Sequence, residues 1–424
     1  HSIHIITNLN VRNDTFKLQF FLFQILRMSY SYIAVLNQTI TDMFLGRPRF
    51  ILHYLGIWPP PGEYKILRNI YKFLVMLTQF SFIFLEFIYI AVVWGDIDEV
   101  SEASYLLFTQ ASVCYKTTVF MMNKNNLKKL ISFMEVGIFA PQTVAHEKIL
   151  SAQARKIRNL SAVFLTSAIT TCTLWAVMPL FDTAETRFFP FKIWMPINTE
   201  KSPHYEIGYL YQVISIYISA LLFCAVDSST LSMIMFGCAE LEIIIDKIQK
   251  IRDILISRVN KSDCRKRLTE NNKLFMECVR HHQCVLSFRF IELVEDTYHA
   301  NIFFQLSGSV GIICIIGLRI TEPSSVQFYS MLNYMLTILS QLFLYCWCGN
   351  ELTSMSQNLR EFLYLCPWYE QNMQFRRSLI IAMERMKRPI IFKAGRYIPL
   401  SRPTFVSILR SSYSYFAVLN QTKK

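Results

Sequence analysis

The sequence is short of charged residues for its length. Lys, Arg, Asp and Glu make up 17% of the 424 residues, whereas a soluble globular chain has about 25%. Hydrophobic residues make up 53% of the chain and aromatic residues 14%. This composition excludes a disordered, collagen-like or coiled-coil chain and disfavours a soluble enzyme. The class that remains is a membrane protein that crosses the bilayer several times.

Motifs of enzyme and receptor chemistry are also missing. The chain has no GxxxxGK(S/T) phosphate loop and no GxSxG nucleophile elbow, and His146-Glu147 lacks the second His of a metalloprotease motif. No pair of carboxylates forms a recognisable acid–base couple. Neither a DRY nor an NPxxY motif is present, which argues against a G-protein-coupled receptor. We therefore predict that the chain is not an enzyme and uses no cofactor.

Histidine and cysteine residues suggest no metal site or disulfide. His281, His282 and Cys284 are close in sequence, but their spacing matches no zinc-ligand pattern, so a structural or surface role is expected. All eleven cysteines fall in predicted helices or in regions assigned below to the cytoplasm. We therefore expect free thiols and no extracellular disulfide framework.

Long apolar stretches are abundant instead. A transmembrane helix needs about 20 mostly apolar residues, and seven stretches of the chain meet this requirement. The seventh is the least apolar because it contains Arg410 and several serines. The sequence thus predicts an all-α membrane protein with seven transmembrane helices. These spans are Phe73–Trp94, Ala103–Met122, Leu160–Leu180, Ile207–Phe236, Thr297–Leu318, Val326–Cys348 and Arg402–Leu419.

The basic residues are distributed unevenly between the connecting regions. Residues 1–69 and the regions after the second, fourth and sixth spans contain 33 of the 43 Lys and Arg residues, whereas the three other loops contain four. Basic residues favour the cytoplasmic side of a membrane. The N-terminus is therefore predicted in the cytoplasm and the C-terminus outside, which is opposite to a G-protein-coupled receptor. The net charge of +13 thus indicates orientation and not nucleic-acid binding.

Two cytoplasmic segments have helical apolar spacing. Leu241–Ile248 continues the fourth span, and Asn271–Glu295 has the pattern of an amphipathic helix. These segments predict a helical cytoplasmic anchor region. They could pack into a shared interface between subunits or within a single subunit.

Ionisable residues within membrane spans are costly and therefore informative. Glu86, Lys116 and Asp227 lie in the first, second and fourth predicted spans. Lys116 is expected to extend its ammonium group towards the membrane surface. Asp227 begins a polar Asp-Ser-Ser-Thr stretch suited to hydrogen bonds between helices. Three isolated groups do not indicate a proton relay.

Large apolar and aromatic side chains lie in the outer halves of several spans. A cavity lined by such side chains would suit a small volatile apolar ligand. Each of them could equally pack against another helix or face lipid. The candidate ligand-binding residues are Tyr105, Phe108, Trp175, Met178, Tyr211, Ile214, Tyr217, Phe328 and Tyr329.

The C-terminal third contains a series of motifs in a specific order. They are Gln341–Leu352, Tyr364–Tyr369, Phe375–Arg377, Lys387–Pro389, Ala394-Gly395, Thr404-Phe405 and Ser412–Thr422. Leu55–Pro59 and Phe189–Pro196 fit the same pattern earlier in the chain. From about residue 43 to the C-terminus, this set closely resembles insect odorant receptors.

This resemblance implies a ligand-gated, nonselective cation channel. Such receptors are tetramers with the coreceptor Orco in the plasma membrane of olfactory sensory neurons, and they bind small volatile odorants. The final helix of each subunit lines the pore, which places Val418 and Thr422 at the gate with Gln421 beside them. Thr422 stands where the coreceptor has Leu. The chain lacks the long loop insertion and tail of the coreceptor, so it resembles a tuning subunit.

Two other functions remain as alternatives. Gustatory-type receptors are related channels, but their last helix usually ends in Gln-Phe, whereas Gln421 is followed here by Thr422. A secondary transporter would require internal structural repeats and broken helices at the membrane midplane, and neither is visible in the sequence.

A segment near the N-terminus repeats part of the last predicted span. Residues 25–39 and 408–422 are identical at 13 of 15 positions. A repeat of one terminal helix does not form a solenoid. We expect that residues 1–42 are the end of a neighbouring duplicated receptor gene fused to a receptor domain of residues 43–424. The alternative is a genuine eighth span, roughly Phe16–Leu36.

Overall fold

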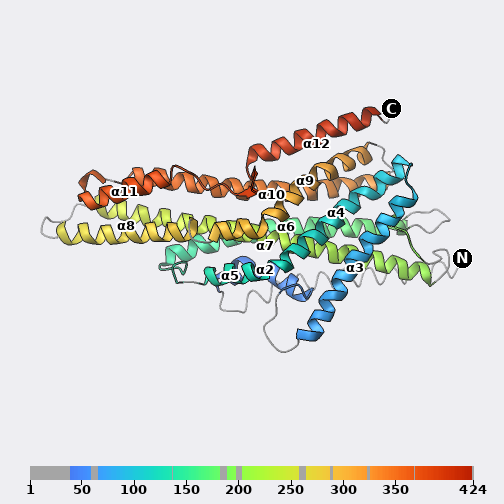
Figure 1. The fold of residues 1–424 in the computed structure, drawn as a ribbon, viewed down its shortest axis with the longest axis horizontal. Helices are drawn as coiled ribbons and strands as arrows, with labels where there is room; N and C mark the ends of the chain where they lie inside the picture. Colours follow the sequence, from blue (N-terminus) through green and yellow to red (C-terminus); the bar gives the residue numbers. More distant parts are fainter. Residues whose placement is uncertain are drawn as a thin grey trace.

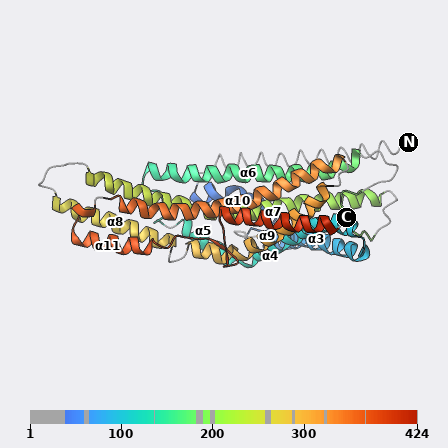
Figure 2. The ribbon, with the colours of Figure 1, turned by 90° about the horizontal axis from the view of Figure 1, so that it is seen from above.

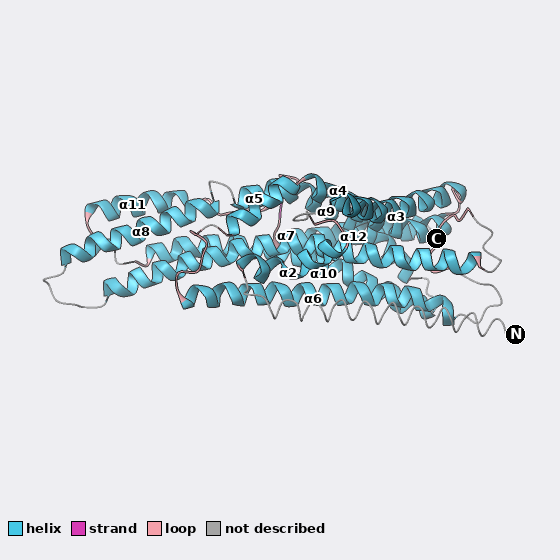
Figure 3. Cartoon of the chain, turned by 90° about the horizontal axis from the view of Figure 1, so that it is seen from below, coloured by secondary structure: helices cyan, strands magenta, loops and turns pink. Residues whose placement is uncertain are grey.

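The structure is a computed structural model of an all-α chain. It describes residues 39–58, 65–135, 137–181, 189–196, 203–256, 264–286, 290–321, 325–366 and 368–422. Figure 3 shows that these residues are almost entirely helical. The helices are α2 (Ile40–Tyr54), α3 (Lys65–Val92), α4 (Ile97–Met122), α5 (Lys124–Met134), α6 (Val144–Phe181), α7 (His204–Ile256), α8 (Cys264–Leu286), α9 (Phe290–Ile320), α10 (Ser325–Tyr364), the 3-10 turn η2 (Trp368–Glu370), α11 (Met373–Arg385) and α12 (Arg402–Thr422).

The long helices form an elongated bundle (Figure 1). Helices α7 and α10 lie between α6 on one side and α3 and α4 on the other (Figures 2 and 3). Helices α8 and α11 pack against each other at one end of the bundle, away from the C-terminal end of α12 (Figure 1). Helix α12 lies along the edge of the bundle, where it contacts α9 and α10.

Six of the seven predicted spans fall within the long helices α4, α6, α7, α9, α10 and α12, and the first, Phe73–Trp94, extends two residues beyond the end of α3. Five segments of the described chain are long and apolar enough to cross a membrane. Helices α4 and α12 are less apolar because α4 contains Lys116 and α12 contains Arg410. The five segments are Ile66–Val92, Val144–Val177, His204–Asp253, Glu270–Ile320 and Phe328–Tyr364.

Several helices continue well beyond the predicted spans. Helix α7 runs on to Ile256, so Leu241–Ile248 does continue the fourth span as expected. The amphipathic helix expected over Asn271–Glu295 is described as two elements, α8 and the start of α9, on either side of residues 287–289. One end of the bundle, opposite the C-terminal end of α12, is formed by α8, α11 and the extensions of α7 and α10 (Figure 1).

Helix α7 is the centre of the core. It contacts α2, α6, α8 and α10, and the side chains of Leu222, Met235 and Phe236 are fully buried. A helix that is surrounded by other helices must be apolar on every side. This requirement explains why the fourth span is the longest apolar stretch of the sequence.

The short helix α2 packs on the side of the bundle. Its N-terminus is capped by Thr39, whose hydroxyl group accepts a hydrogen bond from the backbone N–H of Asp42. Arg47 donates to the carbonyl group of Arg158 on α6 at 2.8 Å. The segment 1–42 therefore contributes the start of α2, whereas residues 1–38, with the first copy of the repeat and the alternative eighth span, lie outside the described residues.

A two-stranded hairpin positions the last helix. Strands β1 (Lys393–Ala394) and β2 (Ile398–Pro399) pair antiparallel. The turn is closed by a hydrogen bond from the backbone N–H of Tyr397 to the Ala394 carbonyl group at 3.1 Å, and its central residues Gly395 and Arg396 both have the positive φ of a type I′ turn. The backbone N–H of Gly395 donates to the carbonyl group of His299 on α9 at 3.0 Å. The hairpin thus attaches the start of α12 to α9.

Candidate functional site

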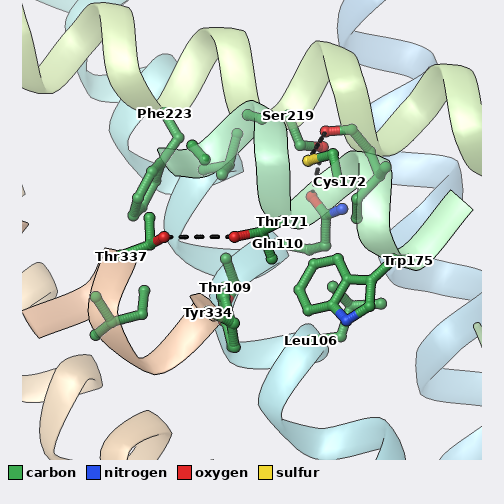
Figure 4. Close-up of a pocket in the computed structure, with 15 residues that line it drawn as sticks. Leu106, Thr109, Gln110, Thr171, Cys172, Trp175, Ser219, Phe223, Tyr334 and Thr337 are labelled. Atoms are coloured by element: carbon green, nitrogen blue, oxygen red, sulfur yellow. Dashed lines mark hydrogen bonds between the residues drawn. The ribbon is translucent and has the colours of Figure 1, made fainter. Parts of the chain in front are cut away.

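A buried cavity of about 50 Å³ lies where α4, α6, α7 and α10 meet (Figure 4). One water molecule needs roughly 10–15 Å³ measured in the same way, so the cavity has room for a small molecule. Its lining residues are Leu106, Thr109, Gln110 and Val113 on α4, Ala168, Thr171, Cys172 and Trp175 on α6, Ile216, Ser219, Ala220 and Phe223 on α7, and Tyr334, Thr337 and Ile338 on α10.

The polar groups of the wall mostly bond to one another or to neighbouring helices. The Ser219 hydroxyl group donates to Oε1 of Gln110 at 2.8 Å. The Thr337 hydroxyl group lies 2.6 Å from that of Ser167 and 3.4 Å from that of Thr171. Two donors of the wall, Nε2 of Gln110 and Nε1 of Trp175, have no hydrogen-bond partner among the described residues. The surface of the cavity is otherwise mainly apolar.

Aromatic rings close the end of the cavity that points away from helices α8 and α11, which is called its outer end. The ring centroid of Trp175 lies 5.0 Å from that of Tyr334 and 6.2 Å from that of Tyr105. Phe191 packs edge-on against Trp175, with centroids 5.3 Å apart and planes at 84°. Edge-to-face and offset arrangements at these distances are favourable for aromatic pairs. The outer end is therefore formed by well-packed rings.

The segment 189–196 holds Phe191 in place. The backbone N–H of Phe191 donates to Oε1 of Gln212 at 3.0 Å, and Nε2 of Gln212 donates to the Phe191 carbonyl group at 3.2 Å. The next residue, Lys192, forms an ion pair with Glu99 at 2.7 Å. Hydrogen bonds from Lys192 and Tyr89 lower the pKa of the Glu99 carboxyl group. These contacts fasten the segment to α4 and α7.

Three of the residues predicted from the sequence are buried in or beside this site. Trp175 lines the cavity. Tyr105 is buried and its ring lies 5.8 Å from that of Tyr334. Tyr217 is also buried, with its hydroxyl group 2.9 Å from that of Thr173. Trp175 and Tyr105 are thus brought together by the fold.

The other predicted residues lie elsewhere. Phe108, Ile214 and Tyr329 are 46%, 37% and 69% exposed, and face away from the interior. Phe328 packs against the ring of Tyr329. Tyr211 is part of a separate contact, in which its hydroxyl group lies 2.7 Å from that of Ser81 on α3. Met178 is in α6, but its side chain lies outside the described residues.

The sequence reasoning did not identify most of the lining residues. It selected large side chains, whereas threonine, serine, alanine and glutamine form much of the wall. Helices α4, α6 and α7 each contribute residues at positions i, i+3, i+4 and i+7, beginning at Leu106, Ala168 and Ile216. This spacing is that of a single helix face. A search for such faces with small and polar members could have found the cavity.

An ion pair lies at the inner end of the cavity. Nζ of Lys116 lies 2.9 Å from Oδ1 and 3.1 Å from Oδ2 of Asp227. The same ammonium group lies 4.3 Å from the ring centroid of Phe223, which lines the cavity. The expectations that Lys116 extends to the membrane surface and that Lys116 and Asp227 are isolated are therefore wrong. The partners are 111 residues apart in the chain, so no local pattern indicated the pair.

Asp227 also binds two residues of α10. It accepts hydrogen bonds from the Tyr345 hydroxyl group at 2.7 Å and from Nε2 of Gln341. Nε2 of Gln305 on α9 donates to Oε1 of Gln341 at 2.7 Å. These hydrogen bonds connect the inner end of the cavity with both helices that contact α12.

His281 has a structural position. Its Nε2 lies 2.9 Å from Oε2 of Glu240 and its Nδ1 lies 3.3 Å from Nζ of Lys247. Both His281 and Glu240 are buried between α7 and α8. Within the described ranges, no group of three or more His, Cys, Asp or Glu residues is placed to hold a metal ion. The pair therefore joins two helices.

The predicted gate residues lie near the end of α12. Val418 is 60% exposed, and Gln421 is also exposed. Thr422 is the last residue of the helix, and its side chain lies outside the described residues. Their position at a pore stays a prediction.

Together, the long apolar helices and their arrangement in one bundle define a helical membrane protein with a cavity between four of its helices. Residues 96–413 match the family model described as 7tm Odorant receptor. The match covers most of the chain, and the chain belongs to this family.

Individual relatives agree with this assignment. The chain is similar to odorant receptor Or1 of Anopheles gambiae, with 26% identity over 397 residues, which are 87% of this chain and 93% of the relative. It is also similar to the structure of the olfactory receptor OR5 from Machilis hrabei, with a TM-score of 0.75 and 17% identity over 90% of this chain and 100% of that chain. The same receptor in complex with eugenol gives a TM-score of 0.74 and 18% identity over the same shares of the two chains. The fold predicted from the sequence is therefore confirmed.

Proposed function

We propose that this chain is the odorant-binding subunit of a ligand-gated, nonselective cation channel. The observation that carries the proposal is the enclosed cavity between α4, α6, α7 and α10, with its aromatic outer end. Its size and apolar surface suit a small volatile molecule. The proposed location is the plasma membrane of olfactory sensory neurons.

The proposed partner is the coreceptor Orco in a heterotetramer. In this arrangement the cytoplasmic N-terminus, the extracellular C-terminus and the pore-lining role of α12 follow from the charge distribution and from the family resemblance. The exposed surface of α12 supports this role. Tyr413, Tyr415 and Val418 are 70%, 61% and 60% exposed in the single chain. Apolar side chains such as Val418 can close a pore by excluding water from it.

Opening of the pore requires that the odorant binds the open state more tightly than the closed state. Helix α10 offers a physical connection because it lines the cavity and also contacts α12. A change in the packing of Tyr334 or Thr337 around a ligand would act on this helix. Helix α9 would be affected by the same change, because Gln305 on α9 donates a hydrogen bond to Gln341 on α10.

Electrical recording tests the proposed function. The full chain is expressed with and without Orco, and an odorant panel is applied while G-protein signalling is blocked. We expect cation currents that depend on both subunits. If both subunits are at the cell surface and no odorant evokes a current beyond that of Orco alone, the channel proposal fails. A gustatory-type receptor would respond without Orco, and a transporter would show substrate uptake.

Epitope tags test the proposed orientation separately. A tag at the C-terminus should bind antibody on intact cells, whereas a tag between α5 and α6 should bind only after permeabilisation. The opposite labelling would reject the orientation and the position of α12 at the outer end of a pore.

A further inference from the structure

Glu86 has a carboxyl group that is buried without a partner. It lies on α3, and its side chain is 0% exposed. Neither carboxylate oxygen has a hydrogen-bond partner in the part of the chain that the structure describes. An ionised carboxylate without a partner is costly in an apolar interior. A ligand that brings the opposite charge would therefore be favoured there.

The buried face of α3 places this carboxyl group near the outer end of the cavity. Gln79, Phe82 and Glu86 follow one another at helical spacing. The hydroxyl oxygen of Ser219, which lines the cavity, lies 2.5 Å from Oε1 of Gln79. The ring of Phe82 lies 6.4 Å from that of Phe191. Glu86 is seven residues beyond Gln79, which is about 10 Å along the helix in the outward direction.

The turn of α3 that carries Glu86 packs against the segment 189–196. The carbonyl group of Leu85, the residue before Glu86, accepts a hydrogen bond from the backbone N–H of Trp194 at 3.3 Å. The Tyr334 ring lies 5.0 Å from that of Trp175 and 5.8 Å from that of Tyr105. Phe191 packs against Trp175 at 5.3 Å. Glu86 therefore lies on the turn of α3 next to the segment whose Phe191 joins the rings of Tyr105, Trp175 and Tyr334.

This combination has the chemistry of a site for an organic cation. A carboxylate forms a charge-assisted hydrogen bond with an ammonium group. The faces of Trp and Tyr rings attract the same group, and the attraction is stronger where water is excluded. An ammonium ion paired with Glu86 would also remove the unfavourable burial of a single charge.

We infer that Glu86 is the counter-ion of a ligand ammonium group and that small volatile amines are the odorants of this chain. The inference rests on the proposed function. The ammonium group binds Glu86, and the hydrocarbon part of the amine fills the cavity. A cavity of about 50 Å³ holds about three to five water-sized groups at roughly 10–15 Å³ each. Short-chain amines have this size.

Two ligands of equal length test the inference. n-Butylamine and 1-butanol have the same number of heavy atoms, and only the amine is charged at pH 7, because an alkylammonium group has a pKa of about 10.4. Currents are recorded from the full chain with Orco, and Orco alone serves as the blank. The amine should have an EC50 at least about tenfold lower than the alcohol.

Substitution of the carboxyl group makes the test specific. Glu86→Gln should raise the EC50 of n-butylamine at least about tenfold and change that of 1-butanol less than about twofold. Asp96→Asn is the matched control, because it removes an exposed carboxylate at the same end of the bundle. It should leave both values unchanged within about twofold. A similar loss in both variants would indicate general attraction of cations and overturn the inference.

Other outcomes separate the inference from the proposed function. The inference fails if 1-butanol is as potent as n-butylamine, or if Glu86→Gln does not change the amine response. In both cases the evoked currents would still support odorant gating, and only the role of Glu86 as a counter-ion would be rejected. If neither compound evokes current, the melting temperature of the purified chain is measured with each compound. A rise with n-butylamine that is lost in Glu86→Gln supports the amine site even without gating. The absence of any rise overturns it.

Folding of the variants is the last control. Glu86→Gln removes a buried carboxyl group that has no partner, so it should melt at or above the temperature of the unsubstituted chain without ligand. Glu86→Met removes the charge with an apolar side chain and should show the same loss of amine response. Strong destabilisation by both substitutions would show that Glu86 has a structural role, and would overturn the inference.

Discussion

Lys116 on α4 and Asp227 on α7 form an ion pair at 2.9 Å, and both side chains are only 1% exposed. The ammonium group of Lys116 lies 4.3 Å from the ring centroid of Phe223, which lines the cavity. Asp227 has further partners in Tyr345 and Gln341. The pair and its hydrogen bonds therefore fix the relative positions of α4, α7 and α10, which form three walls of the cavity.

Removal of one partner should be much more harmful than removal of both. Lys116→Met leaves the Asp227 carboxylate buried without its cation, which should lower the free energy of unfolding by about 3–5 kcal/mol. Lys116→Met combined with Asp227→Asn should recover most of this loss, because no unpaired charge remains. Thermal denaturation of the purified chain and its abundance at the cell surface measure both effects. Equal losses in the single and double variants would contradict this account.

The cavity itself can be tested by filling it. Ala220→Val adds two methyl groups at the wall of the cavity and should abolish or strongly weaken odorant-evoked currents. Stability should change by no more than about 1 kcal/mol, because cavity filling is often stabilising. Ala91→Val, on the exposed side of α3, is the control and should respond normally. Unchanged odorant potency in Ala220→Val would place the ligand elsewhere.

Most of the fold could be predicted from the sequence because it depends on long apolar stretches. Each of the seven predicted spans corresponds to one long helix, since a helix in lipid must satisfy its backbone internally and keep an apolar surface. The ends of the helices were less predictable. Helices α7 and α10 continue to Ile256 and Tyr364 because packing against neighbouring helices maintains them beyond the apolar region.

The site was less predictable because it depends on contacts between distant parts of the chain. Trp175 was found because it is large and aromatic, but Thr109 and Thr337 line the same cavity with small side chains. Phe108 belongs to the same class as Trp175 and is nevertheless 46% exposed. Size and hydropathy do not distinguish a cavity wall from a lipid-facing surface. The side of each helix that faces the cavity is decided only by the packing of the bundle.

Gly349 allows close contact between α10 and the start of α12. A Cβ atom at this position would lie 2.7 Å from the carbonyl oxygen of Leu400, which is backbone and moves only with the chain. Gly349→Ala should therefore displace the beginning of α12 and lower the free energy of unfolding by about 1–3 kcal/mol. If α12 lines the pore, displacement of this helix should also reduce the channel currents.

Gly311 on α9 is the matched control for this substitution. An added Cβ atom would have no heavy atom within 4 Å there, so Gly311→Ala should stabilise the helix by up to about 1 kcal/mol. Melting temperature and current amplitude are compared for the two variants. Equal stability of both variants would show that the contact with Leu400 is unimportant.

The outer segment that carries Phe191 should open in acid. Because Lys192 and Tyr89 lower the pKa of Glu99, the ion pair is fully formed above the ordinary carboxyl pKa of about 4.3. Its contribution is lost as the pH falls through the lower pKa of the folded protein. Hydrogen exchange of residues 189–196, corrected for the intrinsic pH dependence, should be faster at pH 3 than at pH 7. In Glu99→Gln, residues 189–196 should exchange quickly at both pH values. If they exchange as slowly at pH 7 as in the unsubstituted chain, this ion pair is not the cause.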